Sequence, residues 1–343
     1  MKRRLYGKPF GDLMSIKQDF FTQNSEMLEM SAHQADALLR QPKRKVCKIC
    51  HEPIEGDILY ESQRMAYYLC PNCGHVNSAH EDTRDFEKAV YLEDDYEHNY
   101  SEKDRAAFIK RRDEIYIPKA QFLLNILNDR GIKNSDIHVL DDGAGSGYFV
   151  SALRLFHVDA KGIEISKAQV DFGNAMIGEN VIAQADSAKI LSVISGISSN
   201  VISFIGVLEH ITNLDRVIEA VRSNSHIQYV YMSVPMFSLS CILEAANQDC
   251  YNRHAGGTHT HLFTDESLEY LAERMGFKAL ASWKFGSDIM DLYRMLCVKL
   301  AANGNEKLKG YFAKRFMPLM DSLQEVVDKG EFASEIHMIL VRK

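Results

Sequence analysis

The stretch VLDDGAGSGYF, residues 139–149, carries three glycines at alternating positions directly after an apolar run that ends in two aspartates. Glycine allows the backbone to approach a ligand closely. Gly143, Gly145 and Gly147 have the spacing GxGxG, whereas a dinucleotide-binding loop has GxGxxG. No Lys-Ser/Thr pair follows the glycines, which excludes a P-loop. The stretch therefore predicts a strand at 137–141 followed by a loop that binds another kind of ligand.

Strand-like and helix-like segments alternate after this loop. Leu214, Val217, Ile218 and Val221, for example, have the i, i+3, i+4, i+7 spacing of one helix face. Such alternation predicts an α/β fold, with a mainly parallel sheet and helices on both of its faces. The expected strands are 137–141, 158–164, 180–184, 200–205, 227–234, 277–284 and 335–342, with a long helical section at 288–329.

The chain divides by composition into three parts. Residues 1–44 are polar and are expected to be a mostly helical lead-in. Residues 45–104 hold two cysteine pairs and an acidic, tyrosine-rich connector. Residues 105–343 carry the α/β pattern, with 288–329 as a helical insertion.

Composition narrows the class of protein. Of 343 residues, 46% are hydrophobic and 25% are charged, which is typical of a globular protein. The net charge of −7 disfavours a nucleic-acid partner. No apolar run reaches the roughly 18 residues of a membrane helix, and the N-terminus lacks the apolar core of a secretory signal. We therefore expect a cytoplasmic protein without a membrane span.

Four of the seven cysteines form two CxxC pairs. Cys47 and Cys50 are separated from Cys70 and Cys73 by 19 residues, which is the spacing of a four-cysteine zinc site. Four thiolates leave no open coordination position, so the sequence predicts a structural Zn²⁺. A small segment with little core of its own gains folding energy from such a metal. We expect a small zinc-ribbon-like module here.

The segment from Asp141 to Gly147 resembles the first motif of class I S-adenosylmethionine-dependent methyltransferases, Asp/Glu-x-Gly-x-Gly-x-Gly. Glu164 ends the second expected strand, where a carboxylate accepts hydrogen bonds from ribose hydroxyls. IGVLEHI, residues 205–211, resembles the family's VLEH signature. The resemblance implies a Rossmann-like, seven-stranded sheet with S-adenosylmethionine as methyl donor. The donor contacts that it implies are Asp141, Gly143, Ala144, Gly145, Gly147, Tyr148, Glu164, Ile165, Asp186, Ser187, Val207, Leu208 and Glu209.

Further segments resemble the zinc-containing sugar methyltransferases, which include C-methyltransferases of nucleotide-linked deoxysugars. They are HTHLFTDESLEYLAERMGF (259–277), FGSDIMDL (285–292) and the layout of a CxxC module before a tyrosine-rich connector. This resemblance covers the chain from residue 45 onward. It implies a small sugar acceptor, nucleotide-linked or part of a surface glycan precursor, and a role in polysaccharide biosynthesis.

Methyl transfer to oxygen or carbon requires removal of a proton, and histidine is the usual base near neutral pH. His261 is the first candidate and His259 the second, while His210 is placed near the donor by its motif. Each also has a structural interpretation, as a hydrogen-bonded or packed histidine. Thr260 stands where sugar C-methyltransferases have Glu, which leaves O-methylation open. Tyr96 and Tyr100 of the connector, and Asn247, Asp249 and Arg253, are further candidates for acceptor contacts.

Two other functions stay open at this point. One is an RNA or protein methyltransferase that uses the zinc module as a reader, although the acidic charge and the lack of a basic stripe disfavour RNA. The other is a non-catalytic binding protein built on the same fold, because fold alone does not fix function. The lead-in helices and the 288–329 insertion are the candidate homodimer contacts.

Overall fold

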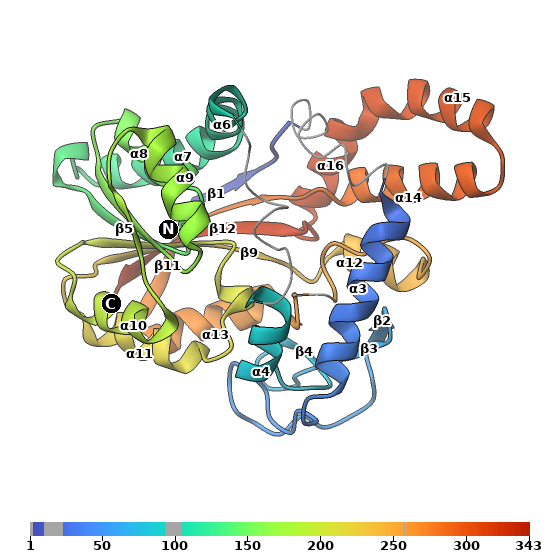
Figure 1. Cartoon of the computed structure of the whole chain (residues 1–343), viewed down its shortest axis with the longest axis horizontal. Helices are drawn as coiled ribbons and strands as arrows, with labels where there is room; N and C mark the ends of the chain where they lie inside the picture. The colour runs from blue at the N-terminus through green and yellow to red at the C-terminus, as the bar shows by residue number, and fades with distance from the viewer. Residues whose placement is uncertain (1–2, 10–22, 93–103, 257) are drawn as a thin grey trace.

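Two sheets organise the chain in the computed structural model, which describes residues 3–9, 23–92, 104–256 and 258–343 and omits the side chains of residues 91, 92, 187 and 188. A large central sheet has helices on both faces, and a smaller sheet lies beside it near α3 and α4 (Figure 1). The predicted α/β class is therefore confirmed.

The central sheet has the strand order β1-β11-β12-β9-β8-β5-β6-β7. Strand β12 runs antiparallel to its neighbours β9 and β11, and all other pairs are parallel. The ends of the predicted strands agree with the observed ones to within two residues. The strands are β1 Arg3–Tyr6, β5 His138–Asp142, β6 Asp159–Glu164, β7 Ile182–Gln184, β8 Val201–Ile205, β9 Tyr229–Pro235, β11 Phe277–Phe285 and β12 Glu335–Arg342.

Strand β1 adds an eighth strand to the seven that the resemblance implies. It lies within the expected helical lead-in and pairs in parallel with β11, from Arg3 opposite Ala281 to Tyr6 opposite Lys284. Four residues are too short to show a two-residue alternation, so the sequence pattern does not reveal it. The helix α3, Asn24–Leu39, agrees with the expected helical character.

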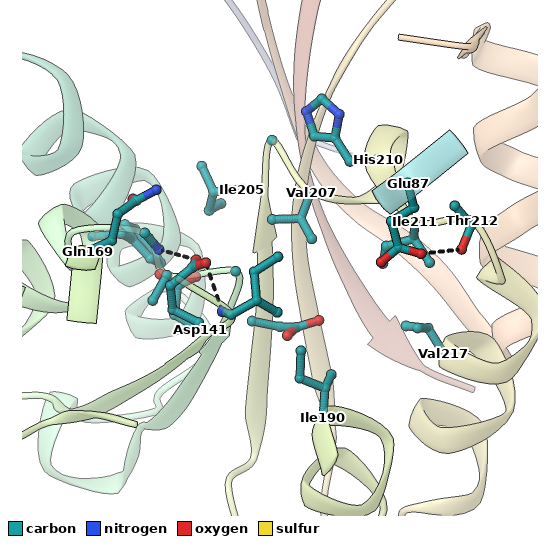
Figure 2. Close-up of a pocket in the computed structure, with 18 of the residues that line it drawn as sticks. Glu87, Asp141, Gln169, Ile190, Ile205, Val207, His210, Ile211, Thr212 and Val217 are labelled. Atoms are coloured by element: carbon teal, nitrogen blue, oxygen red, sulfur yellow. Dashed lines mark hydrogen bonds between the residues drawn. The ribbon is translucent and has the colours of Figure 1, made fainter. Parts of the chain in front are cut away.

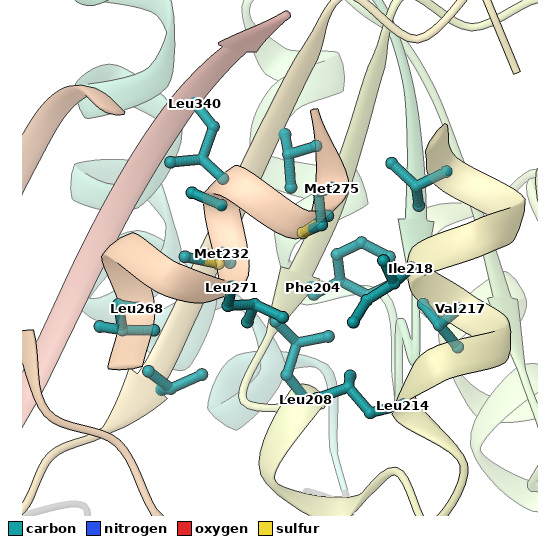
Figure 3. Packing of buried hydrophobic residues seen from close by; sticks show 14 of the residues in the cluster. Phe204, Leu208, Leu214, Val217, Ile218, Met232, Leu268, Leu271, Met275 and Leu340 are labelled. Atoms are coloured by element: carbon teal, nitrogen blue, oxygen red, sulfur yellow. The ribbon is translucent and has the colours of Figure 1, made fainter. Parts of the chain in front are cut away.

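Helices on the two faces of the sheet enclose two separate cores. Helices α7, α8 and α9 cover one face, with Phe122, Phe149 and Val170 among the buried side chains. Helices α10, α11 and α13 cover the other face, where Val217 and Leu271 pack against the sheet (Figure 3). The helices of this domain before the insertion are α6 Arg105–Arg111, η2 Arg112–Tyr116, α7 Ile117–Asn128, η3 Asn134–Asp136, α8 Tyr148–Leu155, α9 Lys167–Ile177, α10 Ser187–Gly196, η4 Leu208–His210, α11 Leu214–Ser223, α12 Leu239–Ala246 and α13 Asp265–Met275.

The smaller sheet combines the cysteine module with a distant segment of the chain. Its order is β10-β4-β3-β2, and all of its pairs are antiparallel. The bounds are β2 Tyr60–Ser62, β3 Met65–Leu69, β4 Val76–Ser78 and β10 His261–Leu262, and the helices α4 Arg84–Glu87 and η1 Lys88–Leu92 follow β4. Arg274 of α13 donates to the carbonyl of Ile49, and Thr264 Oγ1 donates to the Gly74 carbonyl at 3.0 Å. The module is thus docked directly on the main domain.

The insertion between β11 and β12 consists of α14 Asp288–Ala302, α15 Glu306–Phe316, η5 Met317–Leu319 and α16 Met320–Lys329. Buried Asp288 anchors it, because its Oδ1 accepts hydrogen bonds from both the backbone N–H and the hydroxyl of Ser240. Its outer helices expose apolar side chains at Leu308, Tyr311, Met317, Leu319, Leu323 and Val326. A homodimer contact at this insertion stays a prediction. Within the described parts of the chain, no helix has both the length and the apolar character needed to cross a membrane.

Candidate active site

The carboxyl ends of β5, β6 and β8 meet at one edge of the central sheet, and a cavity of about 710 Å³ opens there. Ligands of open α/β sheets bind at this edge, and the volume lies within the usual range of small-molecule sites. Figure 2 shows Asp141 and Gln169 on one side of the cavity and Glu87 and Thr212 on the other. The cavity therefore has two distinct walls.

The glycine loop needs glycine for both backbone and packing reasons. Gly143 has φ +67°, and an added Cβ would lie 2.6 Å from Val207 Cγ2. Gly147 has φ +74° and caps the N-terminus of α8, where a Cβ would lie 2.3 Å from Ile182 Cδ1. L-residues with side chains rarely adopt such φ values. Gly143 lines the cavity together with Ala144, Gly145 and Ser146, whereas Gly147 holds the loop against β7.

Two adjacent buried aspartates end β5 and line the cavity. Ser203 Oγ donates to Asp141 Oδ1 at 2.6 Å, yet burial raises the pKa of Asp141 to about 7. Burial also raises the pKa of Asp142 to about 7. Neither carboxylate has an ion-pair partner among the residues that the structure describes. This wall is suited to a ligand that carries positive charge, because a cation would favour both ionised carboxylates.

Glu164 ties the end of β6 to the glycine loop. Its Oε2 accepts from the Gly145 N–H at 2.8 Å, and its Oε1 accepts from the N–H groups of Ile165 and Ser166 at 2.8 and 2.9 Å. An ionised carboxylate has about four acceptor positions, so one remains for a ligand hydroxyl. Ile165 lines the same wall with 44% of its surface exposed, which leaves an apolar face for a planar ring.

The other donor contacts that the resemblance implies lie in different places. Tyr148 and Val207 line the cavity, whereas Leu208 is buried in the core with Leu214 and Leu271 (Figure 3). Asp186 is exposed and caps α10 by accepting from the Lys189 N–H at 2.8 Å. Ile190 and Leu191 of α10 line the cavity on that side. The side chain of Ser187 lies outside the described residues.

Glu209, His210 and His259 form a compact cluster at the cavity's edge. Each offers one ligand-type atom within 4.8 Å of the others, and the rings of His210 and His259 are 5.0 Å apart. His210 lines the cavity, while Glu209 is only 4% exposed. Burial lowers the pKa of His210 to about 3 and of His259 to about 4, and raises that of Glu209 to about 8. Both imidazoles are therefore neutral at neutral pH.

His261 lies elsewhere. It is fully buried in β10, its Nδ1 is 2.9 Å from His75 Nε2, and its ring packs against Phe263. It is not among the described residues that line the cavity, and neither is His259. Tyr96 and Tyr100 lie outside the described residues. Arg253 has its side chain 10% exposed and is paired with Asp291 at 3.0 Å; it is not among the described residues that line the cavity.

The sequence of residues 108–282 matches a family model described as "Methyltransferase domain". The chain belongs to this family. It is an enzyme, an S-adenosylmethionine-dependent methyltransferase. No curated protein sequence matches the chain.

Solved methyltransferase structures resemble this methyltransferase only distantly. Magnesium protoporphyrin IX methyltransferase from Synechocystis PCC 6803, with bound SAH, has a TM-score of 0.47 and 11% identity, covering 75% of this chain and 97% of that one. Geranyl diphosphate C-methyltransferase from Streptomyces coelicolor A3(2) has a TM-score of 0.42 and 14% identity, covering 71% and 85%. A putative sarcosine dimethylglycine methyltransferase from Galdieria sulphuraria has a TM-score of 0.42 and 16% identity, covering 66% of this chain and 86% of that one.

The methyltransferase has a second cavity wall that the sequence motifs do not reveal. It includes Arg84 and Glu87 of α4 and Arg216 of α11, and Thr212 Oγ1 donates to Glu87 Oε2 at 3.2 Å (Figure 2). Helix α4 has only four residues, which is too short for a helical period to be recognised in the sequence. The one sequence feature that indicates its start is the N-cap residue Thr83. Other polar or aromatic residues on the cavity that were not predicted as contacts are Asp82, Arg111, Tyr116, Asp142, Ser146, Phe149, Gln169 and Asn213.

The four predicted zinc ligands come together in the module. Cys47 and Cys73 have their Sγ atoms 3.6 Å apart, and those of Cys50 and Cys70 are 3.5 Å apart. Thiolates around a tetrahedral Zn²⁺ with bonds near 2.3 Å lie about 3.8 Å from one another, so the geometry fits this ion. Asn77 Nδ2 lies 3.5 Å from Cys47 Sγ and stabilises the thiolate as an outer donor.

Proposed function

We propose that the methyltransferase acts on a sugar acceptor, nucleotide-linked or part of a surface glycan precursor. The observation that carries the proposal is a cavity with an acidic wall, which bears Asp141, Asp142 and Glu164, and an opposite wall on which Arg84 and Arg216 accompany Glu87. The acidic wall suits a cationic methyl donor. The opposite wall suits an acceptor that combines hydroxyl groups with phosphate.

The donor is assigned to the wall formed by the glycine loop and the ends of β5 and β6. S-adenosylmethionine carries an ammonium and a sulfonium charge, and it supplies an electrophilic methyl carbon when bound. Asp141 and Asp142 would offset these charges within a buried site. The remaining acceptor position of Glu164 suits a ribose hydroxyl, and the exposed face of Ile165 suits the adenine ring.

The acceptor is assigned to the wall of α4 and α11. Arg84 and Arg216 are exposed, line the cavity and have no ion-pair partner among the described residues. Guanidinium groups bind phosphate through paired N–H donors, which favours a phosphate-bearing acceptor. Glu87 and Asn213 provide side-chain acceptors and donors for sugar hydroxyls.

The cluster of Glu209, His210 and His259 is proposed to activate the acceptor. His210 is the described histidine on the cavity wall, so the acceptor's proton is lost toward it when the nucleophile attacks the methyl carbon. The carbon–sulfur electron pair passes to sulfur as the new bond forms. Because His261 is fully buried against His75, its proposed contribution is to position β10 and, through it, His259.

We further propose that Cys47, Cys50, Cys70 and Cys73 hold a structural Zn²⁺. The module supports the acceptor wall, because Asp82 lines the cavity and forms buried ion pairs with Lys48 and Arg44. Lys48 lies between Cys47 and Cys50, and Arg44 lies three residues before Cys47. Removal of the metal should therefore disturb the acceptor wall before it disturbs the donor loop.

The test uses radiolabelled methyl donor, purified enzyme and separate host fractions of nucleotide sugars, glycans, RNA and protein. We expect label in the nucleotide-sugar or glycan fraction, and a higher acceptor KM in Arg216→Ala. Arg222→Ala is the matched control, because Arg222 is an exposed arginine near the end of the same helix and is not on the cavity wall. Label in RNA or protein alone would refute the sugar assignment.

A further inference from the structure

The Glu209–His210–His259 cluster combines the donor atoms of a metal site. One carboxylate and two imidazoles present ligand atoms within 4.8 Å of one another. Imidazole and carboxylate ligands suit first-row divalent cations. Glu209 and His210 belong to η4, directly after β8, whereas His259 comes from the segment before β10, so the fold itself assembles the set.

Glu209 supplies an independent sign that a ligand is expected here. The side chain is 4% exposed, and its Oε2 is buried without a hydrogen-bond partner among the described residues. A buried carboxylate oxygen left unpaired carries an uncompensated desolvation cost. A cation in contact with this oxygen would offset that cost.

The surroundings of the two histidines orient them as ligands. His259 Nδ1 is 3.2 Å from the His254 carbonyl, so it donates there and leaves Nε2 with its lone pair. His210 lies beside the Thr258 backbone and offers one ring nitrogen to the same cluster. Metal-binding histidines commonly have their second nitrogen held by such a carbonyl.

We propose that Glu209, His210 and His259 bind a divalent first-row transition cation at the edge of the cavity. Three protein ligands leave coordination positions open, in contrast to the closed four-cysteine site. Because His210 lines the cavity, an acceptor oxygen can complete the coordination sphere. The cation would lower the pKa of an acceptor hydroxyl, as metal ions do for bound water. Because the lone pair of His210 would then bind the cation, the proton would pass to water, whereas in the absence of the cation it passes to His210. This role rests on the proposed function, although binding of the cation does not.

Binding requires only local adjustment of the side chains. Glu209 Oε1 and His210 Nε2 are 4.0 Å apart. Ligand atoms around a cation with bonds of 2.0–2.2 Å lie about 3–3.5 Å from one another. The cluster therefore has to contract by about an ångström, which side-chain rotation can provide.

The test is titration of Mn²⁺ into the full-length protein, followed by electron paramagnetic resonance, with the metal content of the cysteine site measured in parallel. We expect one Mn²⁺ per chain in addition to the cysteine-bound metal, and at least about 100-fold weaker binding in Glu209→Gln and in His259→Ala. His226→Ala is the control, because His226 is exposed and lies outside the cluster. Every variant is first required to show the circular dichroism spectrum and the urea unfolding transition of the wild type, which shows that it is folded.

Two results would overturn the inference: no Mn²⁺ uptake by the wild type at millimolar concentration, or equal uptake by Glu209→Gln. Undiminished methyl transfer in a chelator that leaves the cysteine-bound metal in place would refute the catalytic role of the cation and leave the proposed function standing. Failure of the wild type to bind the donor would refute the proposed function and would not affect Mn²⁺ binding.

Discussion

Gly143→Ala should damage both the stability of the fold and the donor site. Gly143 has φ +67°, and a Cβ there would lie 2.6 Å from Val207 Cγ2 and 3.2 Å from Val207 Cγ1. A left-handed φ costs a residue with a side chain about 1–2 kcal/mol. Overpacking adds about 1–3 kcal/mol, because both methyl groups of Val207 obstruct the new carbon. The free energy of unfolding should therefore fall by about 2–5 kcal/mol.

Gly178→Ala is the matched control. Gly178 has φ +84° at the end of α9, but no atom lies within 4 Å of its added Cβ. The free energy of unfolding of this variant should fall only by the cost of the left-handed φ, about 1–2 kcal/mol. The difference between the two variants isolates the contact with Val207.

The two variants also separate donor binding from stability. Gly143 and Val207 both line the cavity, so relief of the overlap has to move the loop or Val207. We expect Gly143→Ala to bind S-adenosylhomocysteine at least about tenfold more weakly by calorimetry, and Gly178→Ala to bind it as the wild type does. Urea unfolding at equal metal content gives the stabilities. Equal unfolding free energies and equal donor affinities for the two variants would refute the reasoning.

The remaining predictions concern pH, the cysteine site and the core. Burial raises the pKa of Asp141 and Asp142 to about 7. A cationic donor favours the ionised carboxylates, so its affinity should be nearly full at pH 8. At pH 6 the affinity should be about tenfold lower for one required carboxylate and up to about a hundredfold lower for both. Calorimetry showing no change between these pH values would contradict this. Cys50→Ser should lose the metal and raise the acceptor KM at least about tenfold. The donor Kd should stay within about threefold of the wild-type value. An equally large loss of donor binding would contradict the separation of the two walls. Leu271→Ala removes a fully buried side chain and should lower the unfolding free energy by about 2–5 kcal/mol in urea, and a change below 1 kcal/mol would show that Leu271 does not support the core.

The sequence predicts the central sheet apart from β1, and most of the strands that it predicts are at least five residues long and largely buried. The expected strand at 200–205 is observed as Val201–Ile205, and that at 335–342 as Glu335–Arg342. The spacing of the cysteine pairs likewise predicts the grouping of four thiols that the structure contains. Periodicity and motif spacing are local signals, and they succeed where the structure is built from local segments.

The parts that sequence reasoning missed depend on short segments and distant contacts. Strand β10 has two residues, and helix α4 has four, so neither shows a period. Pairing of β10 with β4 separates the two histidines of the sequence His259-Thr260-His261. The ring of His261 contacts His75, whereas the ring of His259 lies beside that of His210. Nothing within the segment distinguishes the two histidines, because the surroundings of each depend on a residue far away in the sequence.

The most direct test of the central claim is a crystal structure of the enzyme with S-adenosylhomocysteine. We expect the ligand in the cavity between the loop Gly143–Ser146 and Val207, with its ribose hydroxyls on Glu164 and its adenine against Ile165. Its sulfur should face the part of the cavity that His210 and Arg216 line. Binding at another surface, or an empty cavity at saturating ligand, would contradict the assignment of this site.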